Sequence, residues 1–408
     1  DDHYFGKALD ELPGLSKDRA FWTYYLDHLR DGRRAAGALA RHGRRHAFYF
    51  DFLSLTDIVD IRARAFRVLR DLAPLKRNLP PLEIGPFKSR TFSLRFFRDM
   101  IIHRAPILEM SVYIGFARLL RHTRARTVVY PYEEKGIERA LLFACGDQDR
   151  PIRTVAFAHA VYNEGHFYLD GRAGDCAPPR PDTVAATSDG RVQQIEKRTH
   201  RSAGTIPAVG SPRHVAGAAA PPSAEYRRKL RVLALIGHGF ELEALANLAE
   251  NGTEVFRDCE LLVRCYPYGW AERQTRAAQR IRTQLPETRI EIGSMEEQIR
   301  WCDVALFDST SAGIHCMLRG RPAIHLALHD FFPVNPFGGH NDSGAPEHCA
   351  DAGALRGALA RFRAMTRKEY LAAAARQMRA AAGIYAPLDR ARWALALGAK
   401  AAAGRTNE

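Results

Sequence analysis

The sequence predicts an α/β protein of two Rossmann-like domains whose parallel sheets face an interdomain cleft. The chain has 408 residues, which is too long for one ordinary hydrophobic core. In both halves, short apolar runs alternate with longer helical patterns, as in a parallel sheet covered by helices. A segment rich in Ala, Gly and Pro at 213–222 separates the two series and is the expected linker.

The first half, residues 1–212, is the expected N-terminal domain. Its apolar and β-branched runs predict strands at 47–50, 127–130 and 154–158. Longer periodic segments between them predict helices at 58–72, 93–121 and 137–145.

Residues 223–385 form the expected C-terminal domain. We expect its strands at 231–236, 260–265, 290–292, 304–307 and 322–326. We expect its helices at 241–248, 271–283, 295–301 and 312–318. Residues 386–408 are expected to form a C-terminal helix that packs back on the N-terminal domain.

Composition excludes several classes of protein. No stretch approaches the roughly 20 apolar residues of a membrane-spanning helix. The seven cysteines are scattered without a C-x-x-C pair, which argues against a disulfide framework or a zinc site and favours the cytoplasm. Because the chain begins at Asp1 rather than Met, we expect either a trimmed chain or a piece of a longer protein.

The net charge of +14 suggests an anionic partner. Arginines gather at 30–45 and again at 88–104, where they alternate with phenylalanines as on a helix that lies on an anionic membrane. The alternative is a solvated basic face. We expect no nucleic acid, since no RNA-binding signature or zinc finger is present. The expected location is the cytoplasm, with peripheral contact at the inner face of its membrane left open.

The segment from Asp308 to Gly313 predicts a phosphate site. A strand runs into a turn of three hydroxyl residues, Ser309, Thr310 and Ser311, and a helix follows. Hydroxyls and free N–H groups at such a turn bind anions, and small residues such as Gly313 allow close approach. Ordinary helix capping is the alternative explanation.

Two other turns are expected to border the same pocket. Gly237, His238 and Gly239 form a small-residue turn after the first strand of the second domain. Arg264 and Tyr266 follow the next strand, where the arginine would contact phosphate and the ring would stack on a base. Arg264 could equally be a structural ion-pair residue. No P-loop is present, which disfavours ATP hydrolysis.

Three residues of the first half are candidates for acid–base chemistry. Glu133 and Glu138 lie where a strand turns into a helix, and either could act as a general base. Carboxylates also favour helix N-termini for dipole reasons alone. His159 follows the neighbouring strand and is a candidate base or phosphate contact, although a lone histidine is more often structural.

Together these segments resemble bacterial surface-carbohydrate biosynthesis proteins of capsule and lipopolysaccharide pathways. The stretch 130–139 resembles their Tyr-Pro-Phe-Glu-Asn…Trp-Glu-Lys pattern, and His159, the hydroxyl turn and Gly320-Arg321-Pro322 resemble later motifs. The stretches 181–184 and 209–213 are similar to the end of their first domain. The resemblance implies a metal-independent glycosyltransferase of the GT-B fold, distantly related to the Kdo transferases.

The chain departs from that family at three places. Ile137 stands where the family tends to have Trp, and Ala158 stands where Gln is usual. Tyr266-Pro267 occupies the place of a His-Pro motif associated with CMP-sugar enzymes.

The function expected from the sequence is sugar transfer from a nucleotide-sugar donor to a cell-surface glycan or glycolipid acceptor. A CMP-sugar such as CMP-Kdo is the first donor to consider and a UDP-sugar the next, with no cofactor or metal. Two alternatives stay open. One is a sugar-nucleotide epimerase or hydrolase of the same fold, and the other is a nucleotide-binding scaffold without catalysis.

Overall fold

The computed structural model describes most of both expected domains, with gaps. Its described residues are 22–24, 37, 40, 46–72, 74, 80–84, 87–91, 93–95, 105–133, 135–161, 179–199, 205–212, 229–237, 239–265, 271–327, 335, 337 and 344–398. The expected linker at 213–222 and the first arginine cluster lie outside them, and so do Arg98 and Arg104 of the second cluster.

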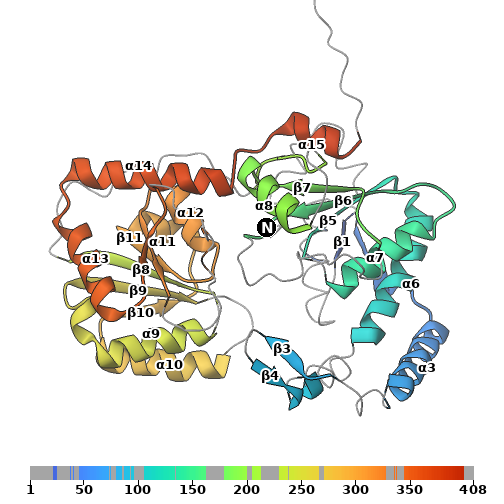
Figure 1. Cartoon of the computed structure of the whole chain (residues 1–408), viewed down its shortest axis with the longest axis horizontal. Helices are drawn as coiled ribbons and strands as arrows, with labels where there is room; N and C mark the ends of the chain where they lie inside the picture. The colour runs from blue at the N-terminus through green and yellow to red at the C-terminus, as the bar shows by residue number, and fades with distance from the viewer. Residues whose placement is uncertain are drawn as a thin grey trace, which may run out of the picture.

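The C-terminal half contains one six-stranded sheet in the order β10-β9-β8-β11-β12-β13 (Figure 1). Every neighbouring pair is parallel. The strands are β8 (Leu230–Ile236), β9 (Cys259–Cys265), β10 (Arg289–Glu291), β11 (Val304–Phe307), β12 (Ala323–Leu326) and β13 (Glu347–Cys349). In chain order this is the 3-2-1-4-5-6 arrangement of the Rossmann fold. The direction of winding therefore reverses between β8 and β11, which is the topological switch point.

Helices cover both faces of this sheet, because alternate side chains of each strand point to opposite faces. The helices are α9 (Gly239–Asn251), α10 (Ala271–Gln284), α11 (Met295–Trp301), α12 (Ala312–Leu318), α13 (Ala352–Ala364) and α14 (Arg367–Ile384), with a short 3-10 helix η3 (Thr253–Phe256). Figure 1 shows α9 and α10 on one face and α12 and α14 on the other. On one face of the sheet, Ala234 belongs to the same hydrophobic cluster as Leu245 of α9. On the other face, Leu235 belongs to the same cluster as Ile314 of α12.

The N-terminal half contains a three-stranded parallel sheet, β5-β6-β7. Its strands are β5 (Thr127–Pro131), β6 (Arg153–Ala158) and β7 (Thr183–Ala186), and its helices are α6 (Ala105–Thr123), α7 (Gly136–Gly146) and α8 (Asp189–Thr199). The core between this sheet and its helices includes Ala156, Val184 and Leu141. The chain is thus an α/β protein with two Rossmann-like parallel sheets, and the predicted fold class is confirmed.

Smaller elements precede this sheet. They are β1 (Trp22–Tyr24), β2 (His46–Phe48), the 3-10 helix η1 (Tyr49–Phe52), α3 (Leu55–Leu72), β3 (Leu82–Ile84) and β4 (Phe87–Ser89). The first two strands pair in parallel and the last two antiparallel. The predicted strand at 47–50 is wrong beyond Phe48, because the Asp51 carboxylate accepts the N–H of Phe48 at 2.9 Å and favours a helical turn.

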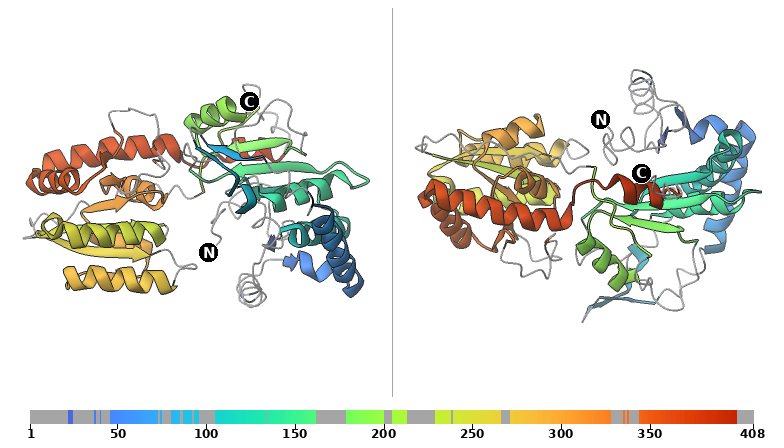
Figure 2. Two further views of the ribbon diagram at one scale, coloured as in Figure 1. Left: turned by 60° about the horizontal axis from the view of Figure 1, so that its bottom comes forward. Right: turned by 90° about the horizontal axis from the view of Figure 1, so that it is seen from above.

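After α14 the chain returns to the N-terminal domain, where α15 (Arg390–Ala396) packs (Figure 2). Trp393 is fully buried, with its ring centroid 5.1 Å from that of Phe157 in β6. The connecting segment passes very close to Gly210, whose φ of 77° is in the left-handed region and where a Cβ would collide with the Pro387 carbonyl. The exact domain boundaries and the cleft stay predictions.

No helix in the described part of the chain combines the length and the apolar character needed to cross a membrane.

Candidate functional site

Two of the predicted turns meet at the topological switch point of the C-terminal sheet. Gly237 follows β8 and Ser309 comes shortly after β11, and these strands are neighbours. A Cβ on Gly237 would lie 3.2 Å from Cβ of Thr310 and 3.4 Å from Oγ of Ser309. Glycine therefore allows the two turns to approach each other, at the edge where ligands of doubly wound sheets bind.

A buried glutamate joins these turns. Glu241, in the first turn of α9, is only 3% exposed. One of its oxygens accepts the N–H of Gly237, and the other accepts the hydroxyl of Ser309 and its N–H at 3.2 Å. Ser309 was predicted to contact phosphate, but both of its donors are used by Glu241. Sequence reasoning did not single out Glu241, although a Glu four residues after a turn glycine was a visible signal.

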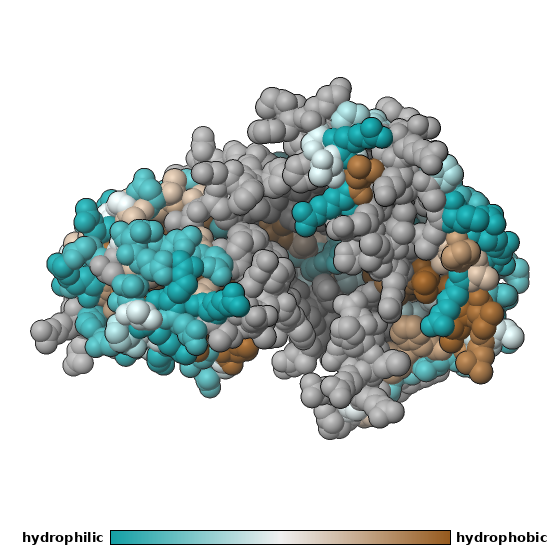
Figure 3. All heavy atoms as spheres, turned by 90° about the horizontal axis from the view of Figure 1, so that it is seen from below, coloured by the Kyte–Doolittle hydropathy of each residue, from teal (hydrophilic) through white to brown (hydrophobic). Residues whose placement is uncertain are grey.

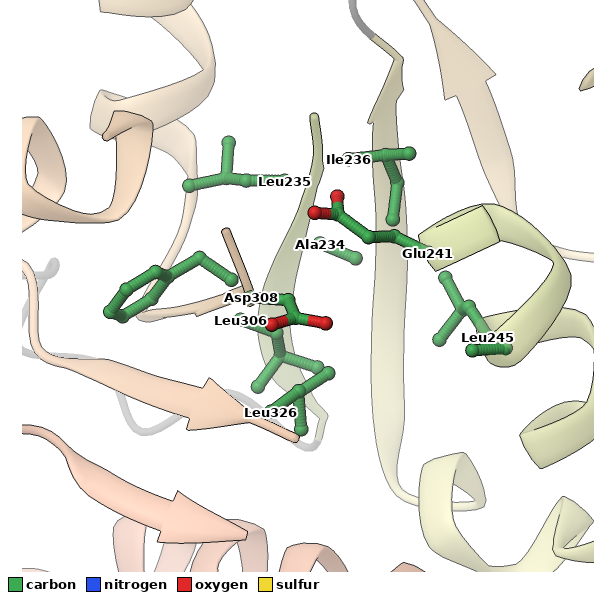
Figure 4. Close-up of a pocket in the computed structure, with 10 residues that line it drawn as sticks. Ala234, Leu235, Ile236, Glu241, Leu245, Leu306, Asp308 and Leu326 are labelled. Atoms are coloured by element: carbon green, nitrogen blue, oxygen red, sulfur yellow. The ribbon is translucent and has the colours of Figure 1, made fainter. Parts of the chain in front are cut away.

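A second carboxylate lies beside the first. Asp308 is 6% exposed, and burial together with the Glu241 charge raises its pKa to about 7. Its Oδ1 is 3.9 Å from Nε2 of His325, whose Nδ1 lies 2.9 Å from Nδ1 of His348. Figure 4 shows the Glu241 side chain reaching from α9 toward the sheet with the Asp308 carboxylate near it. The two carboxylates share a small cavity with apolar side chains such as Ala234, Leu306 and Leu326.

The rest of the hydroxyl turn is less occupied. Thr310 Oγ1 accepts the N–H of Ala312 at 3.2 Å, which is ordinary capping. Within the described part of the chain, the N–H groups of Thr310 and Ser311 donate to no acceptor. Gly313 is required for packing, because a Cβ there would collide with the Phe307 ring.

Arg264 is held by neighbouring structure. Its guanidinium donates to the carbonyl of Gly293 and, at 2.7 Å, to Oε1 of Gln298, and burial lowers its pKa. This geometry favours the structural alternative for Arg264, and its phosphate contact stays a prediction. Gly239 begins α9, while His238 and Tyr266 lie outside the described residues.

The N-terminal sheet brings Glu133 and His159 together. Glu133 follows β5 and His159 follows β6, and Nε2 of His159 lies 3.5 Å from Oε1 of Glu133. His159 is 6% exposed, whereas the Glu133 side chain is 23% exposed and also pairs with Lys135. A carboxylate facing an imidazole orients the ring and stabilises its protonated form, which suits a general base.

Glu138 lies in the same turn but is turned inward. Its two carboxylate oxygens accept the N–H of Glu133, at 3.0 and 3.1 Å, and the residue is 8% exposed. Glu109 of α6 approaches the same helix N-terminus over Gly136, and burial raises its pKa. This arrangement favours a structural role for Glu138, and its catalytic role stays a prediction.

Tyr385, after α14, links the two halves of the site. It is fully buried, and its hydroxyl donates to the carbonyl of His159 at 3.4 Å. Its ring stacks on His315 of α12, with centroids 5.6 Å apart. The histidine turn of one domain is therefore connected through one ring to the helix that follows the hydroxyl turn of the other. Neither Tyr385 nor His315 lies in a motif that the sequence distinguishes.

No group of three or more His, Cys, Asp or Glu side chains among the described residues could hold a metal ion. The predicted independence from metals and cofactors stays a prediction.

Comparison with known proteins gives similarity of fold. No protein-family model matches the sequence, and no curated protein matches it significantly. UDP-GlcNAc 2-epimerase from Neisseria meningitidis is similar at 9% identity and a TM-score of 0.47, over 69% of this chain and 79% of that one. MurG from Acinetobacter baumannii is similar at 12% identity and a TM-score of 0.46, over 88% and 93%. S. aureus TarM is similar at 9% identity and a TM-score of 0.45, over 70% and 58%. At these identities the likeness concerns the fold alone.

Proposed function

We propose that the chain is a GT-B type glycosyltransferase that moves a sugar from a nucleotide-sugar donor to a glycan or glycolipid acceptor. The observation that carries the proposal is the meeting of the Gly237 and Ser309 turns at the switch point, together with a Glu133–His159 pair at the strand ends of the other sheet. A donor site and a base on two Rossmann-like sheets are the parts that sugar transfer needs. A glycolipid acceptor would place the protein at the inner face of the cytoplasmic membrane.

The donor phosphate would bind the hydroxyl turn. Ser309 is engaged by Glu241, so the N–H groups and hydroxyls of Thr310 and Ser311 are donors left for an anion. Glu241 holds the two turns at a constant separation, and preorganised donors of this kind stabilise a departing phosphate without reorganisation.

The acceptor hydroxyl would lose its proton to the Glu133–His159 pair, in which Nε2 of the imidazole faces the carboxylate. As its oxygen bonds to the anomeric carbon, the bond from that carbon to the phosphate oxygen breaks, and the nucleotide leaves with the electron pair. Glu133, 3.5 Å from the imidazole, stabilises the imidazolium that forms. The resemblance implies a CMP-sugar as donor, with a UDP-sugar next, and the experiment decides between them.

The test is thermal unfolding of the purified chain with CMP, UDP, GDP or dTDP. The correct nucleotide should stabilise the fold by about 2.7 kcal/mol at a hundred times its Kd, while the others should have little effect. Ser311→Pro removes one N–H donor at a residue whose φ is already −67°, so it should weaken the shift. Ser311→Ala keeps that N–H and removes only the hydroxyl, so it should lose less of the shift than Ser311→Pro.

If none of the four nucleotides raises the melting temperature, the proposal is wrong. Products separate the remaining alternatives. An epimerised or hydrolysed sugar nucleotide in the absence of acceptor indicates an epimerase or hydrolase. Binding without turnover, unchanged by Glu133→Ala, indicates a scaffold.

A further inference from the structure

Helix α3 carries two apolar stripes, and the inner one is explained by packing. Ile61 and Ala65 are 1% and 2% exposed, and α3 packs against α6. The Asp57 carboxylate accepts from the Arg118 guanidinium of α6 at 2.7 Å, which fixes which side of α3 faces inward. An amphipathic surface helix normally presents polar residues on its other side.

The outer stripe consists of Leu55, Val59 and Phe66. Their side chains are 82%, 66% and 70% exposed. Spacings of four and seven residues place them on one face of the helix. Three large apolar side chains exposed in a row exceed the scattered single ones that are normal on a protein surface.

Arginines lie along the same face. Arg62 is three residues after Val59, and Arg70 is four after Phe66, so both border the outer stripe. Arg64 and Arg67 are also exposed on this helix. Long arginine stems lie along apolar surface while their guanidinium groups reach outward to anions.

Acidic side chains on α3 offset part of this charge. Asp57 is paired with Arg118, and Asp71 is paired with Arg70 at 3.0 Å. Asp60 is one residue after Val59 and therefore lies about 100° around the helix from it. The whole chain carries a net charge of +14.

We infer that the outer face of α3 docks on an anionic lipid membrane. Leu55, Val59 and Phe66 would enter the region between headgroups and acyl chains, and the arginines would pair with lipid phosphates. Figures 1 and 2 show α3 at the outer edge of the N-terminal domain, away from the other sheet. Figure 3 shows apolar side chains gathered with hydrophilic ones at that end of the molecule. This surface differs from the clusters at 30–45 and 88–104 that the sequence indicated, and it does not depend on the proposed sugar transfer.

The test is co-sedimentation of the full chain with vesicles of phosphatidylcholine alone or mixed with phosphatidylglycerol. The protein should bind the anionic vesicles, and binding should fall as salt is raised. The variant Leu55→Ser/Val59→Ser/Phe66→Ser should lower the partition coefficient at least about tenfold, since affinity scales with buried apolar area. Arg62→Gln/Arg70→Gln should weaken binding to anionic vesicles more than to neutral ones.

The matched control is Leu371→Ser/Leu395→Ser, which removes exposed leucines of α14 and α15 (41% and 52% exposed) and should bind like the parent. Circular dichroism and light scattering of every variant establish folding and oligomeric state. Absence of binding by the parent overturns the inference. Equal loss in the control also overturns it, and so does a parent dimer that the α3 variant dissociates, because a second copy would then cover the stripe.

Discussion

Both domains place a glutamate at the third residue of a helix that follows a parallel strand. Glu138 is in α7 and Glu241 is in α9, and both are buried. Each carboxylate folds back to accept an N–H of the preceding turn, Glu133 in one case and Gly237 in the other. The two domains thus share one way of closing a strand–helix turn.

They differ in what the carboxylate does next. Both oxygens of Glu138 accept the same N–H, whereas those of Glu241 are divided between its own turn and Ser309 after the neighbouring strand. In the N-terminal domain the neighbouring strand instead presents His159, which faces Glu133. The same glutamate-to-turn hydrogen bond therefore occurs beside an imidazole–carboxylate pair in one domain, and in the other domain the glutamate also joins two neighbouring turns.

The largest expected effect is on kcat, from substitutions in the Glu133–His159 pair. His159→Ala should lower kcat for sugar transfer by about 10²- to 10⁴-fold, the range for loss of a general base. Because His159 lies in the other domain from the hydroxyl turn, the nucleotide-induced thermal shift should persist. Glu133→Gln should give a smaller loss of kcat, since it removes only the group that orients the ring. Unchanged kcat in both variants would exclude this pair as the base.

The next largest effect is expected at Asp308, on the pH dependence of the free energy of unfolding. Its pKa is about 7 in the folded protein and 3.8 for the free side chain. At a pH between these two values, Asp308 is protonated in the folded state and ionised in the unfolded state. Stability from this group is therefore lost as pH rises through that window. Relative to the parent, Asp308→Asn should gain about 2–3 kcal/mol of unfolding free energy between about pH 5 and pH 8, measured in urea.

Glu250→Gln is the control for this pH experiment. Arg280 lowers the pKa of Glu250, so both its folded and unfolded values lie below the window. Its free-energy difference from the parent should stay constant across the same pH range. A parallel change in both variants would mean that Asp308 is not the titrating group.

The smallest expected effect is a difference in the free energy of unfolding between variants of the two glutamates. Glu241→Gln leaves one oxygen for donors that now use two, so it should cost about 1.5–3 kcal/mol of unfolding free energy. Glu138→Gln keeps an oxygen for the shared N–H of Glu133 and should cost less than about 1 kcal/mol. If urea unfolding showed the same loss of free energy for both variants, the two glutamates would not differ in how they stabilise their turns.

Regular elements with local signals could be predicted well from the sequence. The bounds of α11, β11 and α12 agree with the prediction, and the Ser294 hydroxyl accepting from Glu297 at 3.5 Å marks the start of α11. The predicted helix at 93–121 is observed as α6 from 105 to 123 and as helical residues at 93–95, with 96–104 outside the described residues. Strand β13 was not predicted, because three residues have no periodicity and their pairing with β12 is a long-range contact.

The residue pattern alone was enough to predict where strands turn into helices, and so that His159, Gly237 and the hydroxyl turn lie at the ends of strands. Those positions follow from local hydrophobic periodicity and capping. The folded structure was needed to establish the strand order, the hydrogen bonds from Ser309 to Glu241, 68 positions away, and the contact between Tyr385 and His159. Such contacts depend on how the whole chain packs, which no local pattern of residues encodes.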